Sequence, residues 1–542
     1  MIHATYPHPR SYDSSATFSE TVGHAFLRAV AAAPDAPYVD SPEGAFSFAE
    51  IYRRAARLQL RLQAAGVERG DVVAVQLPNW WETIVAFYAA WGLGAIVNPI
   101  TPIYRTSELS QIFATSRPRA VLAPKVFRGT AYAPIIHSAL VSAGADAALL
   151  LVRDDSGEPP AHAPSAPEFI VVDADPDDVA MLMYTSGTTG RAKGVLHSHR
   201  TLLYEADSIG QVFGPDATTV FMPSPLSHIT GMLYGVLTPM LTRGRVVLQD
   251  QWSPEVAVDL IEAASAAAIV AATPFLRGLI DAYRDRGTTS SLQTFICGGA
   301  DIPADLISQG MQVMGTRVLR TYGSTEMPTL SIVRPSDGDD VRFDSEGAVI
   351  GEAAARTVDA DEQQGIGSLE VHGPELFVGY LDPADNERAF TTDGWFVTGD
   401  LASISDGGTV RIRGRLKDLI VRGGENISAK EVEDFLLGHP DIDDVAVVGF
   451  ADEILGERAC AVVVTRRPDL GLADLVAHLK AVGIAQQKYP EALLVVEQLT
   501  RTVSGKVQKF ELRKQVADAL SAGRLAVRQP ATRQPGEPRQ HG

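Results

Sequence analysis

The segment Met183–His199, MYTSGTTGRAKGVLHSH, gathers hydroxyl side chains and glycines around one lysine, Lys193. A loop of this composition offers backbone N–H groups, hydroxyls and a fixed positive charge, which are the groups that bind phosphate. The lysine is informative because only nine of the 47 basic residues are Lys, and only two of these precede residue 417. The segment is not a Walker loop, since Gly187 and Gly190 are three positions apart and Gly194 follows the lysine. We therefore predict a phosphate-binding loop of another type.

Six further motifs follow this loop in order along the chain. They are PLSHITG, ICGGADI, TYGSTEM, WFVTGD, RIRGRLKDLIVRGGENIS and RTVSGKVQKFELR. Together with YTSGTTGRAKG, this set resembles the acyl-adenylate-forming enzymes, which include acyl-CoA synthetases, adenylation domains and beetle luciferases. The resemblance spans roughly residues 20 to 515. It implies an ATP-dependent ligase in which a carboxylate attacks the α-phosphate of ATP, so that positioning and charge neutralisation carry the catalysis.

The resemblance also implies the contacts to ATP. Lys193 and its loop hold the β- and γ-phosphates, which leave as pyrophosphate. Glu326 corresponds to the Mg²⁺ ligand, with Thr185 as its helper, and Mg²⁺ prefers such oxygen donors. Tyr322 stacks on adenine, and Asp400 accepts hydrogen bonds from both ribose hydroxyls. The implied nucleotide-binding residues are Thr185, Ser186, Gly187, Thr188, Thr189, Gly190, Lys193, Gly298, Gly299, Ala300, Thr321, Tyr322, Gly323, Ser324, Thr325, Asp400, Ile412, Arg415, Lys417 and Lys506.

Residues near the C-terminus are implied to serve two half-reactions. Lys506 corresponds to the lysine that bridges the carboxylate and the α-phosphate in the adenylation transition state. Lys417 corresponds to the hinge about which the small domain turns before a thiol attacks the acyl-adenylate. Gly423 and Gly424 leave room for the pantetheine arm of coenzyme A or of a carrier protein. Thr500 departs from the family pattern, since many relatives have Pro there, and this predicts a less rigid loop before Lys506.

The acid is expected to bind near PLSHITG and TYGSTEM. His228 corresponds to a residue that gates or contacts the substrate carboxylate. The implied catalytic residues are therefore Lys506, His228, Lys193 and Glu326, and the implied acid pocket comprises His228, Ile229, Thr230, Met232, Tyr234, Met327 and Pro328. No acid occurs between Asp216 and Asp250, and a buried ammonium without a partner is costly, so an α-amino acid is disfavoured. The segments QLPNWWE and NPITPIYRTSEL resemble acyl-CoA synthetases for alicyclic, aromatic or medium-chain acids.

Helices and strands must hold these motifs in place, and the sequence between the motifs alternates helical patterns with short apolar runs. Residues 48–66 predict an amphipathic helix that ends at Gly66, residues 71–78 a buried strand, and residues 80–94 a second helix. The alternation recurs from residue 246 to the segment TFICGGA, where Cys297 is predicted to end a buried strand rather than act as a nucleophile. Such alternation favours a parallel sheet in an α/β domain.

The pattern of predicted elements changes twice further along the chain. Short strands punctuated by glycine begin at about residue 340, and a compact α+β segment with a helix from about Ala429 follows GRLKDLIVRGGENIS. The predicted fold class is α/β: a large N-terminal domain of stacked α/β subdomains plus a β-rich subdomain, residues 1–416, then a small mobile α+β domain, residues 417–525, with its hinge at Lys417. The tail, residues 526–542, is rich in Pro, Arg and Gln and is predicted to be disordered.

Composition limits the classes of partner. A net charge of -19 disfavours nucleic-acid and membrane-surface binding, which need clustered Lys and Arg. No apolar run approaches the ~20 residues that cross a bilayer, and the N-terminus has no secretory signal pattern. Two cysteines are too few for a disulfide framework or a zinc cluster, which predicts a cytoplasmic protein. The expected partners are a small carboxylic acid, ATP, Mg²⁺ and coenzyme A, with a carrier protein as the alternative acceptor, in a monomer or homodimer.

Other functions remain open at this point. An acid activator that loads a separate carrier protein is one alternative. The carrier is expected to be separate, because only about thirty residues follow Arg513, too few for a fused carrier domain. A luciferase-like oxidative enzyme shares every motif. A non-catalytic nucleotide-binding regulator is disfavoured, since Lys506 and Glu326 are both present.

Overall fold

The computed structural model describes residues 18–153, 167–185, 192–213, 219–299, 302–361, 365–422, 425–452, 455–484, 486–502 and 505–527. The chain divides into two compact units. The first comprises Met1–Val358, Leu369–Thr398 and Ile404–Arg411, and the second comprises Asp359–Ser368, Gly399–Ser403 and Ile412–Gly542. The boundary between domains at Lys417 stays a prediction.

Among the described residues, the strands that precede residue 416 form two large sheets and two smaller ones. The seven-stranded sheet has the order β20 (Gly379–Tyr380), β10 (Lys193–Ser198), β9 (Val179–Thr185), β4 (Ile96–Pro99), β3 (Val72–Val75), β5 (Ala120–Pro124) and β8 (Ala148–Val152). The nine-stranded sheet has the order β17 (Ala348–Val349), β16 (Ser331–Ile332), β15 (Arg317–Tyr322), β14 (Thr294–Cys297), β13 (Ala268–Ala271), β11 (Thr219–Met222), β12 (Arg245–Leu248), β1 (Pro37–Ser41) and β2 (Gly44–Ser47). The smaller sheets are β18 (Ala354–Val358), β19 (Gly367–His372), β21 (Phe396–Ile404) and β22 (Val410–Arg415), and β6 (Val126–Phe127) with β7 (Thr130–Ala131).

The helices that the sequence predicts near residues 48–66 and 80–94 form at those places. The predicted amphipathic helix is α2: Ser47 and Glu50 form its capping box, and Gly66, in the left-handed region at φ +76°, follows its end. The helices of the first unit are α1 (Val22–Ala32), α2 (Phe48–Ala64), α3 (Trp81–Gly92), α4 (Thr106–Ser116), α5 (Ala133–Ala143), α6 (His199–Phe213), α7 (Ile229–Met232), η1 (Leu233–Leu237), α8 (Thr238–Thr242), α9 (Pro254–Ala264), α10 (Thr273–Arg286), α11 (Ala304–Gln309), η2 (Gly310–Met314), α12 (Asp339–Asp344) and α13 (Pro383–Asn386).

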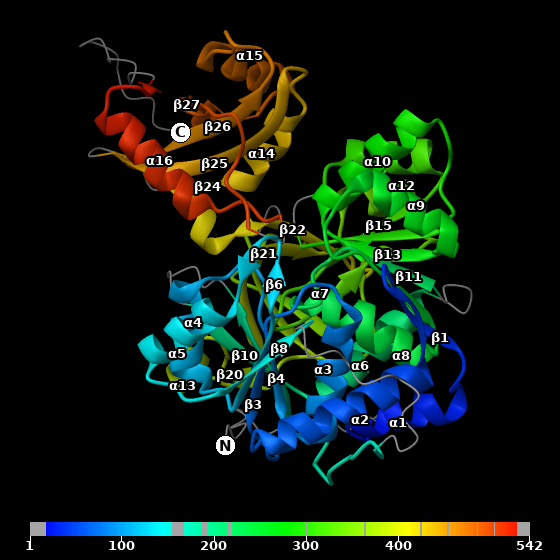
Figure 1. The fold of residues 1–542 in the computed structure, drawn as a ribbon. Helices are drawn as coiled ribbons and strands as arrows, with labels where there is room; N and C mark the ends of the chain where they lie inside the picture. The colour runs from blue at the N-terminus through cyan, green and yellow to red at the C-terminus, as the bar shows by residue number, and fades with distance from the viewer. Residues whose placement is uncertain are drawn as a thin grey trace, which may run out of the picture. The chain divides into compact units, whose positions relative to one another are not determined.

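The first unit is layered, with helices on both faces of each large sheet (Figure 1). One core joins the two sheets through α1, α2, α3 and α6, and all twelve residues of α3 are buried within it. A helix that is apolar on every side needs such a position between two layers. A second core packs α9, α10 and α11 on the outer face of the nine-stranded sheet, and a third packs α4 and α5 on the outer face of the seven-stranded sheet.

The predicted motifs follow adjacent parallel strands of the nine-stranded sheet. The strands β11, β13, β14 and β15 are neighbours and run parallel. PLSHITG follows β11, the glycines of ICGGADI follow β14 at the buried Cys297, and TYGSTEM begins at the end of β15. The strand order reverses at β11, because β12 and β13 lie on its opposite sides. In open α/β sheets the carboxyl edge at such a switch point is where ligands bind.

The second unit is built on strands whose two faces carry different helices. Val445 and Val447 of β25 (Ile442–Asp452) pack with α14 (Ala429–Leu437) and α15 (Leu472–Val482), and the alternate residues Ala446 and Val448 pack with α16 (Lys509–Ser521). The sheet has the order β24 (Glu425–Ser428), β23 (Leu419–Arg422), β26 (Gly456–Thr465), β27 (Ala492–Val495) and β28 (Ala526–Val527), with β25 (Ile442–Asp452) also paired to β26. Its helices are η3 (Leu416–Asp418), α14 (Ala429–Leu437), α15 (Leu472–Val482), η4 (Gln486–Lys488) and α16 (Lys509–Ser521).

The predicted disordered tail begins with an ordered pair of residues. Ala526 and Val527 form β28 and pair with β27, because the backbone groups of that strand accept one more partner; residues 528–542 lie outside the described residues. In the part of the chain that the structure describes, no helix combines the length and apolar character needed to cross a membrane.

Candidate active site

The predicted phosphate loop connects two strands of one hairpin. β9 ends at Thr185 and β10 begins at Lys193, and these two residues lie opposite each other in the antiparallel register. Thr185 and Lys193 therefore face each other across the base of the loop. The predicted phosphate contacts Ser186, Gly187, Thr188, Thr189 and Gly190 lie outside the described residues, as do Ala300, Gly423 and Gly424.

Tyr380 brings the predicted phosphate lysine and the predicted Mg²⁺ ligand together. β20 pairs with β10, which places the Tyr380 ring 4.5 Å from the Lys193 ammonium. The Tyr380 hydroxyl donates a hydrogen bond of 2.7 Å to Glu326 Oε1. The Lys193 ammonium also lies 3.3 Å from the Asp385 carboxylate. Burial raises the pKa of Tyr380 above its usual range, and the charge of Glu326 raises it further, so the hydroxyl stays a neutral donor.

The TYGSTEM loop is a tight turn that fixes Glu326. Ser324 Oγ accepts hydrogen bonds from the backbone N–H groups of Glu326 and Met327, each 3.2 Å long. Gly323 has no side chain at a point where a Cβ would lie 1.9 Å from the Pro328 carbonyl oxygen, so only glycine fits. Fully buried His197 contacts the Thr325 carbonyl oxygen at 2.8 Å through its Nε2. Backbone contacts therefore position the carboxylate of Glu326.

The segment predicted to lie against adenine leaves little room for side chains. Gly298 follows β14 and lies against Thr321 of β15, where a Cβ on Gly298 would approach Thr321 Cγ2 to 2.5 Å. The neighbouring Gly299 adopts φ +77°, a left-handed conformation that favours glycine. The segment next to Tyr322 thus has the small backbone that the sequence predicts, while the stacking of Tyr322 on adenine stays a prediction.

The predicted acid-binding residues lie on one helical segment and one loop. His228 is the N-cap of α7, and Gly231 allows that helix to approach the Pro225 carbonyl oxygen, where a Cβ would lie at 2.0 Å. The chain then forms η1, a π-helical turn of a kind often found at functional sites. Tyr234 of η1 makes a short hydrogen bond with the Thr329 hydroxyl, two residues beyond Met327. The fold thus joins Tyr234 to the TYGSTEM side, while the acid pocket itself stays a prediction.

Two buried carboxyl groups adjoin this segment, and the sequence analysis missed both. Tyr234 donates a hydrogen bond of 2.7 Å to Glu205 Oε1 on α6, and both side chains are buried. Burial raises the pKa of Glu205 to about 7. Burial raises the pKa of Glu375 well above its usual range, and the charge of Glu205 raises it further. Among the described residues, neither Glu205 Oε2 nor Glu375 Oε2 has a hydrogen-bond partner. No local motif marks these glutamates. For Glu205, the sequence of α6 does not reveal which face of that helix packs against η1.

The two residues predicted to contact the ribose of ATP, Asp400 and Arg415, form an ion pair in the second unit. Asp400 lies on β21, and its buried carboxylate is 3.0 Å from Arg415 Nε at the end of β22. Ile412 lies on the same strand as Arg415, and Lys417 lies in η3 directly after it. A buried carboxylate beside a guanidinium has the charge and acceptor atoms to bind a diol.

The loop that carries Lys506 is closed by hydrogen bonds of its backbone and of its threonine side chains. The Lys506 N–H donates to Thr502 Oγ1 at 3.1 Å, and its carbonyl oxygen accepts from the Thr502 N–H at 2.7 Å. The Thr500 carbonyl oxygen accepts from Gln508 N–H at 2.8 Å, and the Thr500 hydroxyl accepts from Gln515 of α16. These bonds close the loop at Thr500, where the sequence predicts lower rigidity.

Comparison with known proteins decides the family. The model described as AMP-binding enzyme matches residues 26–381, and that of the AMP-binding enzyme C-terminal domain matches residues 431–506. The chain is an AMP-binding enzyme. The predicted membership of the acyl-adenylate-forming superfamily is thereby confirmed, and the enzyme is an acyl-adenylate-forming ligase that acts on a small-molecule acid.

Relatives of this AMP-binding enzyme differ in their reactions. The medium-chain fatty-acid–CoA ligase of Escherichia coli strain K12 is 34% identical over 501 residues, covering 89% of this chain and 88% of the relative. The 2,3-dihydroxybenzoate-AMP ligase of Bacillus subtilis strain 168 is 30% identical over 496 residues, covering 88% and 90%. The crystal structure of ATP-bound MatB from Rhodopseudomonas palustris matches with a TM-score of 0.82 at 28% identity, covering 92% of this chain and 99% of that one. This match confirms the predicted α/β fold class.

Replacing Tyr380 by Phe should weaken the response of the enzyme to Mg²⁺. The change removes the hydrogen bond to Glu326, which is the predicted Mg²⁺ ligand, and loss of a group that holds a metal-binding carboxylate typically costs about 10- to 100-fold in metal affinity. We expect the Mg²⁺ concentration for half-maximal pyrophosphate release to rise about 10-fold. Tyr283→Phe is the matched control, because Tyr283 also donates to a glutamate, Glu262, on the outer helices. A similar shift in both variants would contradict the role of Tyr380.

Replacing Glu205 by Gln should change how stability depends on pH. Because the pKa of Glu205 is raised to about 7 in the folded enzyme, against 4.5 ordinarily, folding favours its protonated form. Its contribution to stability is full below pH 4.5 and is lost as the pH rises through about 7. Gln lacks this titration, so the free energy of unfolding of Glu205→Gln should gain roughly 2 to 3 kcal/mol on the wild type between pH 5 and 8.

Denaturant unfolding at several pH values measures this difference. Glu387→Gln is the control, because Glu387 is exposed and its replacement should shift stability equally at pH 5 and 8. A pH-independent difference between Glu205→Gln and the wild type would show that Glu205 is ionised in the folded enzyme.

Proposed function

We propose that the enzyme joins a carboxylic acid to AMP, with release of pyrophosphate, and then transfers the acyl group to the thiol of coenzyme A. The observation that supports this most is the contact series Lys193–Tyr380–Glu326. It joins the predicted phosphate loop of one sheet to the predicted Mg²⁺ ligand after β15 of the other. A cation and a carboxylate held this way suit the pyrophosphate end of ATP and its metal ion.

The donor set fits Mg²⁺. Glu326 is only partly buried, and one carboxylate oxygen accepts the Tyr380 hydroxyl, which leaves the other for a metal ion. Among the described residues no group of three or more His, Cys, Asp or Glu is arranged to hold a metal, so Glu326 and Thr185 would act together with phosphate oxygens. When bound, Mg²⁺ neutralises charge on the departing pyrophosphate.

The chain's own residues divide the remaining work in this proposal. Lys193 holds the leaving phosphates, and the Asp400–Arg415 pair holds the ribose. Lys506 neutralises the charge that develops as the carboxylate oxygen attacks the α-phosphate. The new bond joins that oxygen to phosphorus, and the bond to the β-phosphate oxygen breaks. In the second step the thiol sulfur attacks the acyl carbon and AMP leaves.

The proposed acid is aliphatic, alicyclic or aromatic and lacks an α-ammonium group. Ile229, Met232 and Met327 are buried and apolar, which suits an apolar acyl chain. Glu205 does bring an acid next to Tyr234, but burial raises its pKa to about 7 and thus disfavours its charged form. A neutral carboxyl group does not balance a buried ammonium.

A pyrophosphate-release screen tests the proposal. Medium-chain fatty, alicyclic, benzoic and hydroxybenzoic acids and amino acids are each incubated with ATP and Mg²⁺, with and without coenzyme A. We expect release with one class of non-amino acids, and acyl-CoA by mass spectrometry only when coenzyme A is present. No release with any acid, in a protein that binds ATP, would contradict the proposal.

Loading of a carrier protein is the second candidate. It is kept because the relatives include an AMP ligase as well as a CoA ligase. Adding phosphopantetheinylated carrier proteins to the same screen separates the two acceptors, since only one of them should raise the turnover above single-turnover adenylate formation. Because both cysteines of the chain are buried and unpaired, we propose the reducing cytoplasm as the place of the reaction.

A further inference from the structure

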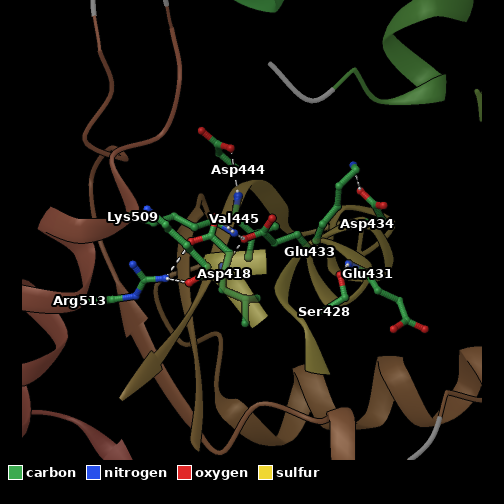
Figure 2. Close-up of polar contacts among 12 residues, drawn as sticks. Asp418, Ser428, Glu431, Glu433, Asp434, Asp444, Val445, Lys509 and Arg513 are labelled. Atoms are coloured by element: carbon green, nitrogen blue, oxygen red, sulfur yellow. Dashed lines mark hydrogen bonds and ion pairs between the residues drawn. The ribbon is translucent and has the colours of Figure 1, made fainter. Parts of the chain in front are cut away.

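The predicted hinge is tied to the last long helix of the second unit. The Nη2 atom of Arg513 on α16 lies 2.8 Å from the carboxylate of Asp418, which is the residue directly after Lys417. The same nitrogen donates to the Lys417 carbonyl oxygen at 3.3 Å. Figure 2 shows the guanidinium beside the Asp418 carboxylate. One side chain of α16 therefore holds both the backbone and the side chain of the hinge segment.

A second cation on the same helix face extends this contact. Lys509, one turn before Arg513, lies 2.8 Å from Glu433 Oε1 of α14 and 4.0 Å from Asp418 Oδ2. Glu433 Oε1 in turn accepts a hydrogen bond of 2.6 Å from the Val447 N–H of β25. We call Asp418, Glu433, Lys509 and Arg513 the hinge clamp. The clamp links η3, α14 and α16 within the second unit.

The other face of α16 is fixed by apolar packing. Leu512 and Val516 are fully buried in the core that includes Val448 and Cys460 of the sheet. The helix thus contacts the sheet with one face and the hinge segment with the other. The clamp and this core therefore fix α16 from two sides.

The Lys506 loop leads directly into this helix. Lys506 lies three residues before Lys509, and Arg501 and Val507 form a β-bridge at the base of the loop. The Arg501 guanidinium donates to the Gly505 carbonyl oxygen at 2.7 Å and pairs with Asp444 of β25 at 2.6 Å. The loop is therefore fixed to the same sheet and helix that the clamp connects to the hinge.

We propose that the hinge clamp positions Lys506 by holding α16, and the loop that leads into it, to the segment after Lys417. This inference rests on the proposed function, in which Lys506 serves the first half-reaction. Arg513 and Asp418 are positioning residues in this proposal, since they act through α16. The Arg513–Asp418 pair is partly exposed, and such pairs contribute little to stability, so its value lies in fixing geometry.

The two half-reactions should depend on the clamp unequally. Gly423 and Gly424 follow Asp418 through β23, so the covalent chain connects them to the hinge directly. Lys506 lies far along the sequence and is connected to the hinge through the clamp. A small misplacement of a catalytic group can cost up to about 100-fold in rate. Loss of the clamp should therefore slow adenylation far more than thioester formation.

Arg513→Gln tests this with the full-length enzyme and the acid found in the screen. We expect pyrophosphate release in single turnover to fall about 10- to 100-fold, and acyl-CoA formation from supplied acyl-adenylate to stay within about 2-fold. Arg513→Lys keeps the charge and should recover most of the adenylation rate, which a purely structural defect would not predict. Asp418→Asn removes the clamp from the other side and serves if Arg513→Gln does not fold.

Lys514→Gln is the matched control. Lys514 lies next to Arg513 on α16, and its exposed pair with Glu511 makes no contact with the hinge clamp. Both rates should stay at the wild-type level in this variant. Equal losses in the two half-reactions for Arg513→Gln and Asp418→Asn, or no loss in either, would overturn the inference. A wild type that releases no pyrophosphate with any acid would instead overturn the proposed function, so the two failures are distinguishable.

Discussion

Adenylate formation should fall about 100- to 1000-fold when Lys506 is replaced by Ala, because removal of one group that stabilises developing charge typically costs this much. The loop itself should persist. Its bonds to Thr502 use the backbone N–H and carbonyl of Lys506, which Ala retains. The change therefore removes the ammonium and leaves the surrounding geometry intact. Pyrophosphate release in single turnover measures the loss.

The second half-reaction separates this role from a general defect. Thioester formation from supplied acyl-adenylate and coenzyme A should stay within about 3-fold of the wild type, since that step transfers no phosphoryl group. Lys480→Ala is the control, because Lys480 is an exposed lysine on α15 of the same unit. Equal losses in both steps would contradict the division of labour that we propose for Lys506.

Replacing Glu326 by Gln should be the second large change, about 100-fold in pyrophosphate release at fixed Mg²⁺. Gln keeps the shape of the side chain and can still accept the Tyr380 hydroxyl, but it lacks the charge that attracts a divalent cation. A Mg²⁺ titration should show a higher requirement and a lower rate at saturation. Glu387→Gln, at an exposed glutamate, should behave as the wild type.

A double variant shows whether Tyr380 acts through Glu326. Residues that form one contact give effects that do not add. The Tyr380→Phe change should therefore raise the Mg²⁺ requirement of the wild type and have little further effect in Glu326→Gln. Full additivity of the two effects would mean that Tyr380 serves another group, with Lys193 as the neighbour to examine next.

Much of the fold follows from local sequence patterns. The helix of residues 48–66, the strand of residues 71–78 and the helix from residue 80 all form where periodicity and glycine predict them. The capping box at Ser47 and the left-handed Gly66 involve neighbours in sequence, so local chemistry decides them. The seven ordered motifs likewise indicated the family, because each keeps its residue types within a short segment.

These local patterns could not predict contacts between segments that are distant in the sequence. Tyr380 meets Lys193 only because β20 pairs with β10, and it meets Glu326 only because the loop after β15 lies beside that pair. The sequence around Tyr380 predicted short strands and gave no sign of a polar role. The same holds for Glu205, whose neighbours on α6 do not show that its side chain meets Tyr234.

The sequence by itself determined the α/β class, the motif order and the scarce lysines that suggest phosphate chemistry. Periodicity, caps and motifs depend on residues within a few positions of one another, and such information survives without a fold. The tertiary structure alone decided which polar groups meet: Tyr380 with Glu326, Glu205 with Tyr234, and Arg513 with Asp418. These meetings depend on strand register and on which helix face is buried, and both are settled only when the whole core packs.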